Sequence, residues 1–99
     1  VYKVTKDFPD DEKFGLTNQM RRCAVSITSN IAEGFCKRTN KDKIKFYNTS
    51  QGSVAELQNQ LLIARDVGYL EENIFNELAE QSVIVFKLIN GLVKYVQGE

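Results

Sequence analysis

The sequence contains no histidine among its 99 residues. Without imidazole, the chain cannot form the Ser-His or Cys-His pairs of nucleophilic enzymes. It also lacks the Glu-x-x-His ligands of a di-iron helix bundle. Glycine-rich phosphate loops, Walker motifs and the cysteine spacing of zinc sites do not occur either. We therefore predict no enzymatic activity, no cofactor, no metal site and no small-molecule substrate.

Long apolar segments are absent as well. No run approaches the roughly 20 residues that a membrane-spanning helix needs, and no signal peptide is present. The two cysteines, Cys23 and Cys36, lie in or near an apolar helical stripe, so we expect two buried thiols in a reducing cytoplasm. The alternative, a disulfide, has no support from their spacing. These features predict a cytoplasmic protein without membrane contact. The chain begins at Val1 rather than at methionine, so we also expect that residues precede it.

Proline occurs once, at Pro9, where it ends a segment that resembles the tail of a helix, VYKVTKDFP. A second helix is expected to begin at Thr17 as its N-cap. Gly34, followed by the basic pair Lys37 and Arg38, has the composition of a helix C-terminus. The apolar stripe of this helix has steps of three or four residues and consists of Leu16, Met20, Cys23, Ile27, Ile31 and Phe35.

A third helix should begin after Thr39, which is followed by Asp42 at the spacing of a capping box, and end at Gly68. About 28 residues at 1.5 Å each make it roughly 40 Å long, which suits a member of an elongated bundle. Its stripe consists of Ile44, Tyr47, Val54, Leu57, Leu61 and Ala64. Gly52 lies inside this helix at a cost of about 1 kcal/mol relative to alanine. We expect Gly52 to allow close approach of another helix.

A fourth helix is expected over residues 71–96, and it carries two apolar stripes. The first consists of Ile74, Leu78, Val85, Leu88 and Leu92, and the second of Phe75, Ala79, Ser82, Phe86, Ile89, Val93 and Val96. Together they exceed the arc of about 100° that one core-facing helix buries. We expect the surplus to be buried against another subunit. The predicted fold is a single all-α domain over 1–99, an antiparallel up-down four-helix bundle with most of its first helix preceding Val1.

Three segments resemble one known family. FGLTNQMRRCAVSITSNIAEGF (14–35), GSVAELQNQLLIARDVGYL (52–70) and LINGLVKY (88–95) are similar to the four-helix-bundle proteins encoded in bacterial 23S rRNA intervening sequences. The resemblance covers nearly the whole chain. It implies a small cytoplasmic bacterial protein without enzymatic activity that assembles into a homopentameric barrel.

The resemblance also has departures. Many members have proline at the position of Thr28, so this second helix should be straighter. The accessory variability determinant of diversity-generating retroelements is similar in fold, is strongly basic, and works with a reverse transcriptase and nucleic acid. This chain is neutral, with 13 basic and 13 acidic residues. The family name records a genomic location and does not show binding to rRNA.

One group of polar residues lies at helical spacing: Arg22, Asn30, Glu33, Gln51 and Glu56. It could form a polar ligand pocket, or a hydrogen-bonded layer that sets helix register. We favour the layer, in which Arg22 would pair with a carboxylate on the neighbouring helix. Glu33 and Glu56 could also approach one another between the second and third helices.

Basic residues are concentrated in one part of the chain. Residues 13–45 carry eight basic and two acidic side chains. The candidate contacts to nucleic acid are Arg21, Lys37, Arg38, Lys41, Lys43 and Lys45. They could bind phosphates without reading base sequence, or they could simply keep a helical turn solvated. The sequence alone slightly favours the solvated turn, and the family resemblance raises the binding hypothesis.

Our primary hypothesis is a non-enzymatic homo-oligomer that presents basic turns to RNA, DNA or a nucleoprotein. The alternative is a protein–protein scaffold or accessory subunit without nucleic-acid contact. The two differ in salt dependence, because contacts to phosphates weaken steeply as salt rises.

Overall fold

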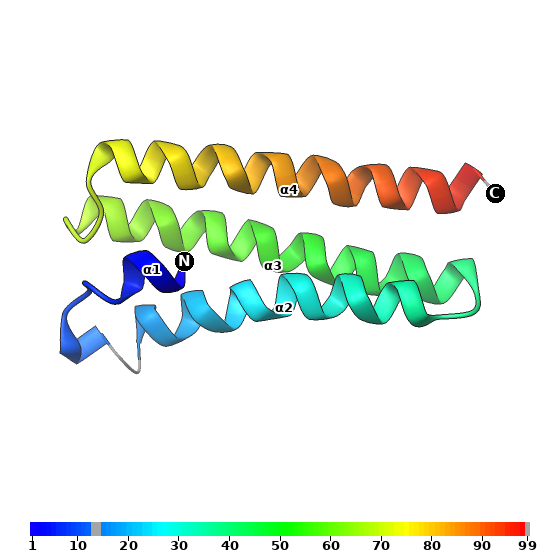
Figure 1. Ribbon diagram of the computed structural model, residues 1–99, viewed down its shortest axis with the longest axis horizontal. Coiled ribbons are helices and arrows are strands. Elements are labelled where there is room, and N and C mark those ends of the chain that lie inside the picture. Colours follow the sequence, from blue (N-terminus) through cyan, green and yellow to red (C-terminus); the bar gives the residue numbers. More distant parts are fainter. Residues whose placement is uncertain (13–14, 99) are drawn as a thin grey trace.

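The computed structural model describes residues 1–12 and 15–98. Three long helices run antiparallel, α2 (Leu16–Cys36), α3 (Asn40–Asp66) and α4 (Glu72–Gly98) (Figure 1). They are preceded by a single helical turn, α1 (Tyr2–Thr5), and a 3-10 turn, η1 (Asp10–Glu12). The part of the chain that the structure describes contains no strand. The predicted all-α antiparallel architecture is confirmed.

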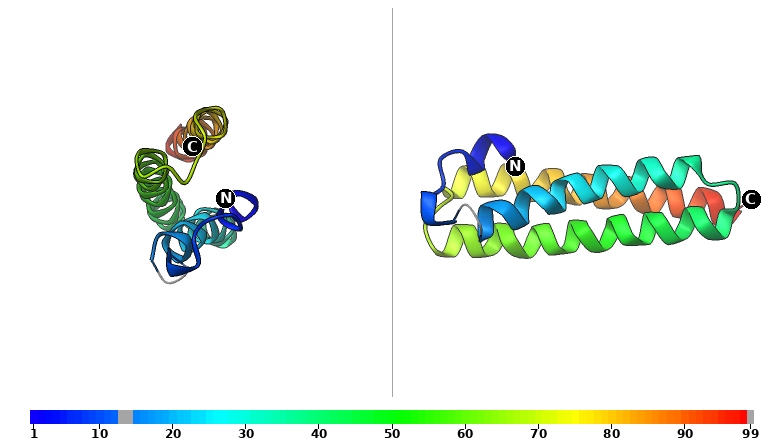
Figure 2. Two further views of the ribbon diagram at one scale, coloured as in Figure 1. Left: turned by 90° about the vertical axis from the view of Figure 1, so that its left-hand side faces the viewer. Right: turned by 90° about the horizontal axis from the view of Figure 1, so that it is seen from below.

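Helix α3 is the centre of the molecule. Helices α2 and α4 both pack against α3 rather than against each other, so the three form a V in cross-section (Figure 2). The molecule measures 46 × 24 × 17 Å. The remaining position of a four-helix bundle, in the mouth of the V, holds only α1 at one end. Side chains of all three long helices line a pocket on this side of the molecule, and we call the surface between α2 and α4 the groove.

The contact between α2 and α3 depends on small side chains. Ser50 is fully buried and donates a hydrogen bond from Oγ to the carbonyl of Ile27 at 2.8 Å. The hydroxyls of Ser26 and Ser53 are also 2.8 Å apart. The large side chains that α2 and α3 bury completely are Tyr47, Met20, Leu61 and Val54. The expected close approach at Gly52 is wrong, because Gly52 is exposed and a Cβ there would meet no atom within 4 Å.

The two ends of α2 also differ from expectation. Gly15 is the N-cap, and Thr17 lies one residue inside the first turn, where its buried Oγ1 finds no partner among the described residues. Gly34 does not cap the C-terminus, because α2 continues to Cys36. Gly34 serves helix packing instead of capping, because a Cβ at this position would lie 2.5 Å from Tyr47 Cε1.

The ends of α3 are as predicted. Thr39 is the N-cap, and its side chain accepts a hydrogen bond from the Asp42 amide at 3.2 Å. At the other end, Gly68 has φ = +86° and supplies the left-handed residue that ends the helix. The amide of Tyr69 then reaches back to the carbonyl of Ala64 at 2.8 Å. Local sequence therefore determines both boundaries of this helix.

Helix α4 buries one of its two apolar stripes. The buried residues recur every seven positions along the face that packs on α3: Phe75, Ser82, Ile89 and Val96. The other stripe is less covered, and Leu88 is 65% exposed. Of the two thiols, Cys23 is buried and Cys36 is exposed, which corrects the expectation that both are buried. None of the described helices is both long and apolar enough to cross a bilayer.

Candidate nucleic-acid interface

Three helix ends meet at the turn between α2 and α3. The chain leaves α2 through Lys37, whose backbone is extended, and re-enters a helix after Thr39. The C-terminal part of α4 reaches the same place, because Asn40 donates from Nδ2 to the carbonyl of Val96 at 3.3 Å. We call this region, residues 33–45 and 92–98, the basic end.

The basic end carries six basic residues and two acidic ones. The basic residues are Lys37, Arg38, Lys41, Lys43, Lys45 and Lys94, and the acidic ones are Glu33 and Asp42. Lys94 was not among the sequence-based candidates, because it is about 50 positions away along the chain. The predicted antiparallel order of the helices could have revealed Lys94, because it brings the end of α4 back to the turn between α2 and α3.

Lys43 has a structural task. Its ammonium donates to the carbonyls of Phe35 at 3.1 Å and Gly34 at 3.4 Å. These carbonyls belong to the last turn of α2, where the usual intrahelical donors run out, although Gly34 O also accepts from the Lys37 amide at 3.2 Å. Lys43 therefore caps α2, and its charge faces the negative end of the helix dipole.

Lys37 is also engaged locally. Its ammonium lies 3.8 Å from Glu33 Oε2 and 4.9 Å from the centre of the Phe46 ring. The ion pair joins two substantially exposed groups, so it contributes little to stability. The contacts nevertheless compensate part of the charge of Lys37 within the protein.

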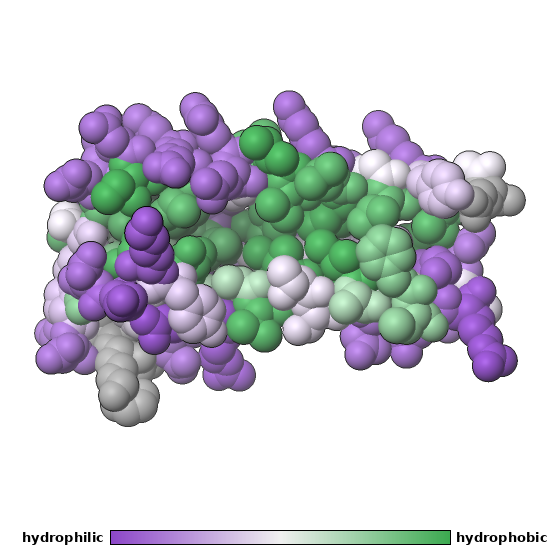
Figure 3. Space-filling view, viewed as in Figure 1, coloured by the Kyte–Doolittle hydropathy of each residue, from purple (hydrophilic) through white to green (hydrophobic). Residues whose placement is uncertain are grey.

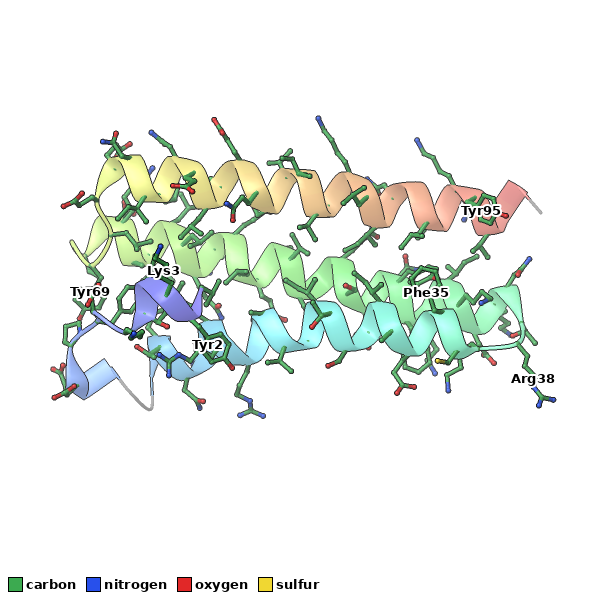
Figure 4. All side chains as sticks on the ribbon, viewed as in Figure 1. Tyr2, Lys3, Phe35, Arg38, Tyr69 and Tyr95 are labelled. Atoms are coloured by element: carbon green, nitrogen blue, oxygen red, sulfur yellow. The ribbon has the colours of Figure 1, made fainter. Side chains whose placement is uncertain are left out.

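Three of the cations predicted from the sequence remain uncompensated. Arg38, Lys41 and Lys45 are exposed and make no ion pair or side-chain hydrogen bond within the described ranges. Arg38 extends away from the bundle at the turn (Figure 4). These three side chains are therefore the members of the predicted set that are free to meet a phosphate.

Arg21 does not belong to this surface. It lies sixteen residues before Lys37 on α2, which is about 24 Å along a helix. Its Nε donates to Thr5 Oγ1 at 2.9 Å, and its guanidinium lies 4.9 Å from the centre of the Tyr2 ring. Arg21 thus holds α1 against α2 at the opposite end of the molecule.

The predicted polar set is dispersed rather than layered. Gln51 bonds to Asn90 on α4, and Asn30 donates to the Ser26 carbonyl within its own helix at 2.8 Å. Glu33 pairs with Lys37 as described above. Glu33 and Glu56 therefore lie at different levels, because α2 and α3 are antiparallel and Glu56 faces the first half of α2.

Arg22 and Glu56 share a shallow cleft of about 480 Å³ on the outer side of α2 and α3. The structure records no ion pair between them, although both side chains belong to its described part. The Cys23 thiol donates to Glu56 Oε2 at 3.5 Å. Burial raises the pKa of this thiol, a Gln60 hydrogen bond opposes that effect, and Glu56 adds to it. The thiol is therefore protonated at neutral pH and is not an activated nucleophile.

Ligands for a metal do not gather anywhere in the described ranges. No group of three or more cysteine, aspartate or glutamate side chains there has the geometry to hold an ion.

An apolar surface runs along the groove towards the basic end. Figure 3 shows this band between α4 and α2. Near α1 it forms a pocket of about 220 Å³ between the three long helices, and Val1 contributes to its wall. At the basic end it includes two exposed aromatic side chains, Phe35 and Tyr95, at 60% and 69% exposure. Helical spacing predicted Phe35 on a core stripe, and no motif pointed to Tyr95.

Fold and surface together define an all-α bundle protein with a basic end and an apolar groove. Residues 1–91 match the 23S rRNA-intervening sequence protein family. The chain belongs to this family, as its sequence motifs indicated.

Comparison with solved structures supports the same fold. The chain is similar to a protein of unknown function from the S23 ribosomal protein family of Bacteroides thetaiotaomicron VPI-5482, with a TM-score of 0.83 and 22% identity. The match covers 94% of this chain and 84% of the other. At this identity the likeness concerns the fold alone. No curated protein matches the chain.

Proposed function

We propose that this chain is a non-enzymatic, self-associating bundle protein of the cytoplasm that contacts RNA, DNA or a nucleoprotein through its basic end. The observation that carries the proposal is the group of uncompensated cations Arg38, Lys41 and Lys45 around the turn between α2 and α3. Lysine and arginine side chains of this kind bind phosphate oxygens without reading bases.

The distribution of charge along the molecule supports contact through the tip. Residues 1–12 and 65–77, at the opposite end, carry eight acidic and three basic side chains. A polyanion is therefore attracted to one end of the 46 Å molecule and repelled by the other. The neutral net charge conceals this polarity.

Self-association rests on the apolar surface of α4. Ile84 and Leu88 are 58% and 65% exposed, one helical turn apart. The family resemblance implies a homopentamer, and a ring of subunits would present five basic ends on one face. Several weak phosphate contacts would then act together through multivalency.

Light scattering tests the assembly. We expect a particle larger than one subunit at micromolar concentration, and we expect Leu88→Glu to reduce its mass. Val67→Glu is the matched control. Like Leu88, Val67 is apolar and exposed (55%), but it lies at the C-terminal end of α3 and not on the apolar surface of α4. A folded parent that is monomeric at this concentration contradicts the assembly.

A fluorescence-anisotropy titration tests nucleic-acid binding. Labelled structured RNA, duplex DNA and single strands are titrated from low to physiological salt. We expect binding that weakens as salt rises. The triple variant Arg38→Glu, Lys41→Glu, Lys45→Glu should lose it, and each lost phosphate contact should reduce the salt slope by about one.

The matched control reverses the same number of charges elsewhere. Lys3→Glu, Lys6→Glu and Lys87→Glu change exposed residues outside the basic end. We expect this variant to keep most of the affinity. Equal loss in both variants would show that net charge, and not the basic end, drives binding. A parent that binds nothing at low salt would leave the basic end as a solvated turn.

A protein scaffold or accessory subunit is the second candidate, and the exposed apolar band of Figure 3 favours it. Such a surface would bind a protein partner through contacts that do not weaken as salt rises. Association that persists at high salt and survives the triple charge reversal would support this alternative.

A further inference from the structure

The basic end combines its cations with aromatic rings. Phe35 lies in the last turn of α2, and Tyr95 lies near the end of α4, next to Lys94. Both rings are on the same face of the molecule and at the same end (Figure 4). They are among the most exposed large apolar side chains of the described residues. Aromatic rings beside a positively charged surface are the combination that proteins use to bind single strands.

The Phe35 ring is held in place from below. It meets the Tyr47 ring edge-on, with centroids 6.1 Å apart and an interplanar angle of 74°. Tyr47 is 1% exposed, so its ring is a fixed part of the core. Lys43 also holds the backbone of Phe35 through its carbonyl. An exposed ring with this support is ordered before any ligand arrives, which lowers the entropy cost of binding.

The cations at this end of the molecule favour an anionic ligand for the aromatic surface. The aliphatic exposed residues of α4, Ile84 and Leu88, lie further from the turn, whereas the two rings lie at the end of the bundle that also carries Arg38, Lys41 and Lys94. A purely apolar partner gains nothing from those cations and must desolvate them. A polyanion with exposed flat rings satisfies both features at once.

We propose that the basic end binds single-stranded nucleic acid in preference to duplex, with bases stacking on Phe35 and Tyr95 and phosphates meeting Arg38, Lys41, Lys45 and Lys94. The inference rests on the proposed function and specifies its ligand. Duplex bases are already stacked on one another and present only their edges. A single strand can turn its bases outward onto aromatic side chains.

The chain has no tryptophan, so a single substitution creates a specific reporter. Phe35→Trp is titrated with oligo(dT) and with a duplex of equal length at low salt. We expect quenching of the introduced indole by the single strand and little change with the duplex. Val67→Trp, at the opposite end of α3, is the control that should show no quenching by either ligand.

A second variant separates stacking from general apolar contact. Phe35→Leu with Tyr95→Leu keeps apolar bulk at both positions but removes the aromatic faces. We expect single-strand affinity to fall by at least about fivefold for each ring that stacks, and duplex affinity to stay unchanged. Circular dichroism should show the parental helix content, because both side chains are largely exposed.

The outcomes are distinguishable. If the parent binds neither ligand, the proposed function fails and this inference fails with it. If single strand and duplex bind equally and the leucine variant keeps its affinity, phosphate contact stands and stacking is overturned. If the indole is shielded before any ligand is added and the leucine variant changes only the oligomeric mass, the rings belong to a protein interface. That result also overturns the inference.

Discussion

Gly34 of α2 lies against the ring of Tyr47 of α3, so closely that a Cβ at position 34 would stand 2.5 Å from Cε1 of the ring. The Tyr47 ring is 1% exposed. The same ring supports Phe35 at the surface. One missing methyl group therefore sets how closely two helices approach beneath the basic end.

Gly34→Ala should lower the free energy of unfolding by about 1–2 kcal/mol. Overpacking of a core costs about 1–3 kcal/mol, and the better helix propensity of alanine offsets up to about 1 kcal/mol of it. Urea titration followed by circular dichroism measures the change. Gly52→Ala is the matched control and should stabilise by up to about 1 kcal/mol, because nothing lies within 4 Å of its Cβ. Equal stabilisation by both substitutions would show that Tyr47 yields freely.

Gly68→Ala should destabilise the turn between α3 and α4. At φ = +86° an L side chain is strained, and the cost of the left-handed conformation is about 1–2 kcal/mol. The expected fall in Tm is roughly 4–8 °C per kcal/mol for a domain of this size. Gly68→Asn should recover part of the loss, because asparagine tolerates this conformation better. An unchanged Tm for alanine would contradict the assigned C-cap.

Arg21→Met should release α1 without affecting nucleic-acid binding. The substitution removes the hydrogen bond to Thr5 and the contact with the Tyr2 ring. Hydrogen exchange should accelerate in residues 2–8 and remain unchanged in α3. The neighbouring Arg22→Met is the control, since Arg22 is exposed and makes no ion pair in the described part of the chain. If Arg21→Met but not Arg22→Met lost salt-dependent binding, Arg21 would contact nucleic acid and its exclusion from the interface would be wrong.

Stability should decrease at alkaline pH. Burial raises the pKa of the Cys23 thiol above its ordinary value of 9.0 and that of the Tyr47 phenol above 10.0. The folded state therefore retains protons that the unfolded chain has released. Each group contributes stability that is complete below its unfolded pKa and is lost as pH rises towards its folded pKa. The slope approaches about 1.4 kcal/mol per pH unit for each group.

Urea titrations at a series of pH values between 8 and 11 measure this slope. Cys23→Ala should flatten the part that begins near pH 9.0, and Tyr47→Phe the part that begins near pH 10.0. Identical slopes in the parent and both variants would contradict the assignment.

The two thiols should react at different rates. Cys36 is exposed, whereas Cys23 is 7% exposed and its raised pKa keeps it protonated. A colorimetric thiol reagent at pH 8 should modify Cys36 first and Cys23 only when the bundle opens. Cys36→Ser should remove the fast phase and leave the slow one. A fast phase that survives this substitution would show that Cys23 is accessible.

The helix boundaries show where sequence reasoning succeeds. Thr39 and Gly68 act through their own backbone, so their local chemistry was enough to predict the ends of α3. Thr17 and Gly34 are also residue types that commonly cap helices, but neither caps α2 in the folded chain. Thr17 is buried one residue inside α2, and Gly34 makes room for a ring from another helix. Gly52, which was expected to allow the close approach of another helix, is exposed.

The candidate site divides in the same way. Residues 37–45 are close in sequence, so their gathering at one tip follows from any helical hairpin. Lys94 joins them only because α4 returns antiparallel, and Arg21 leaves them because it lies four turns earlier on α2. The polar set is dispersed because its members share a spacing but not a level in the bundle. Helical periodicity gives the face of a helix and not the partner at each level.

Periodicity, caps and composition are local properties, so they were enough to predict an all-α antiparallel bundle and a neutral chain whose basic residues cluster, and three motifs were enough to indicate the family. Which cations remain uncompensated and which aromatic rings stay exposed could not be predicted in this way. Both depend on what other helices bring to the same place. Lys43 donates hydrogen bonds to the end of α2, and Arg21 donates one to Thr5 of α1. The Phe35 ring remains at the surface, where it contacts the Tyr47 ring.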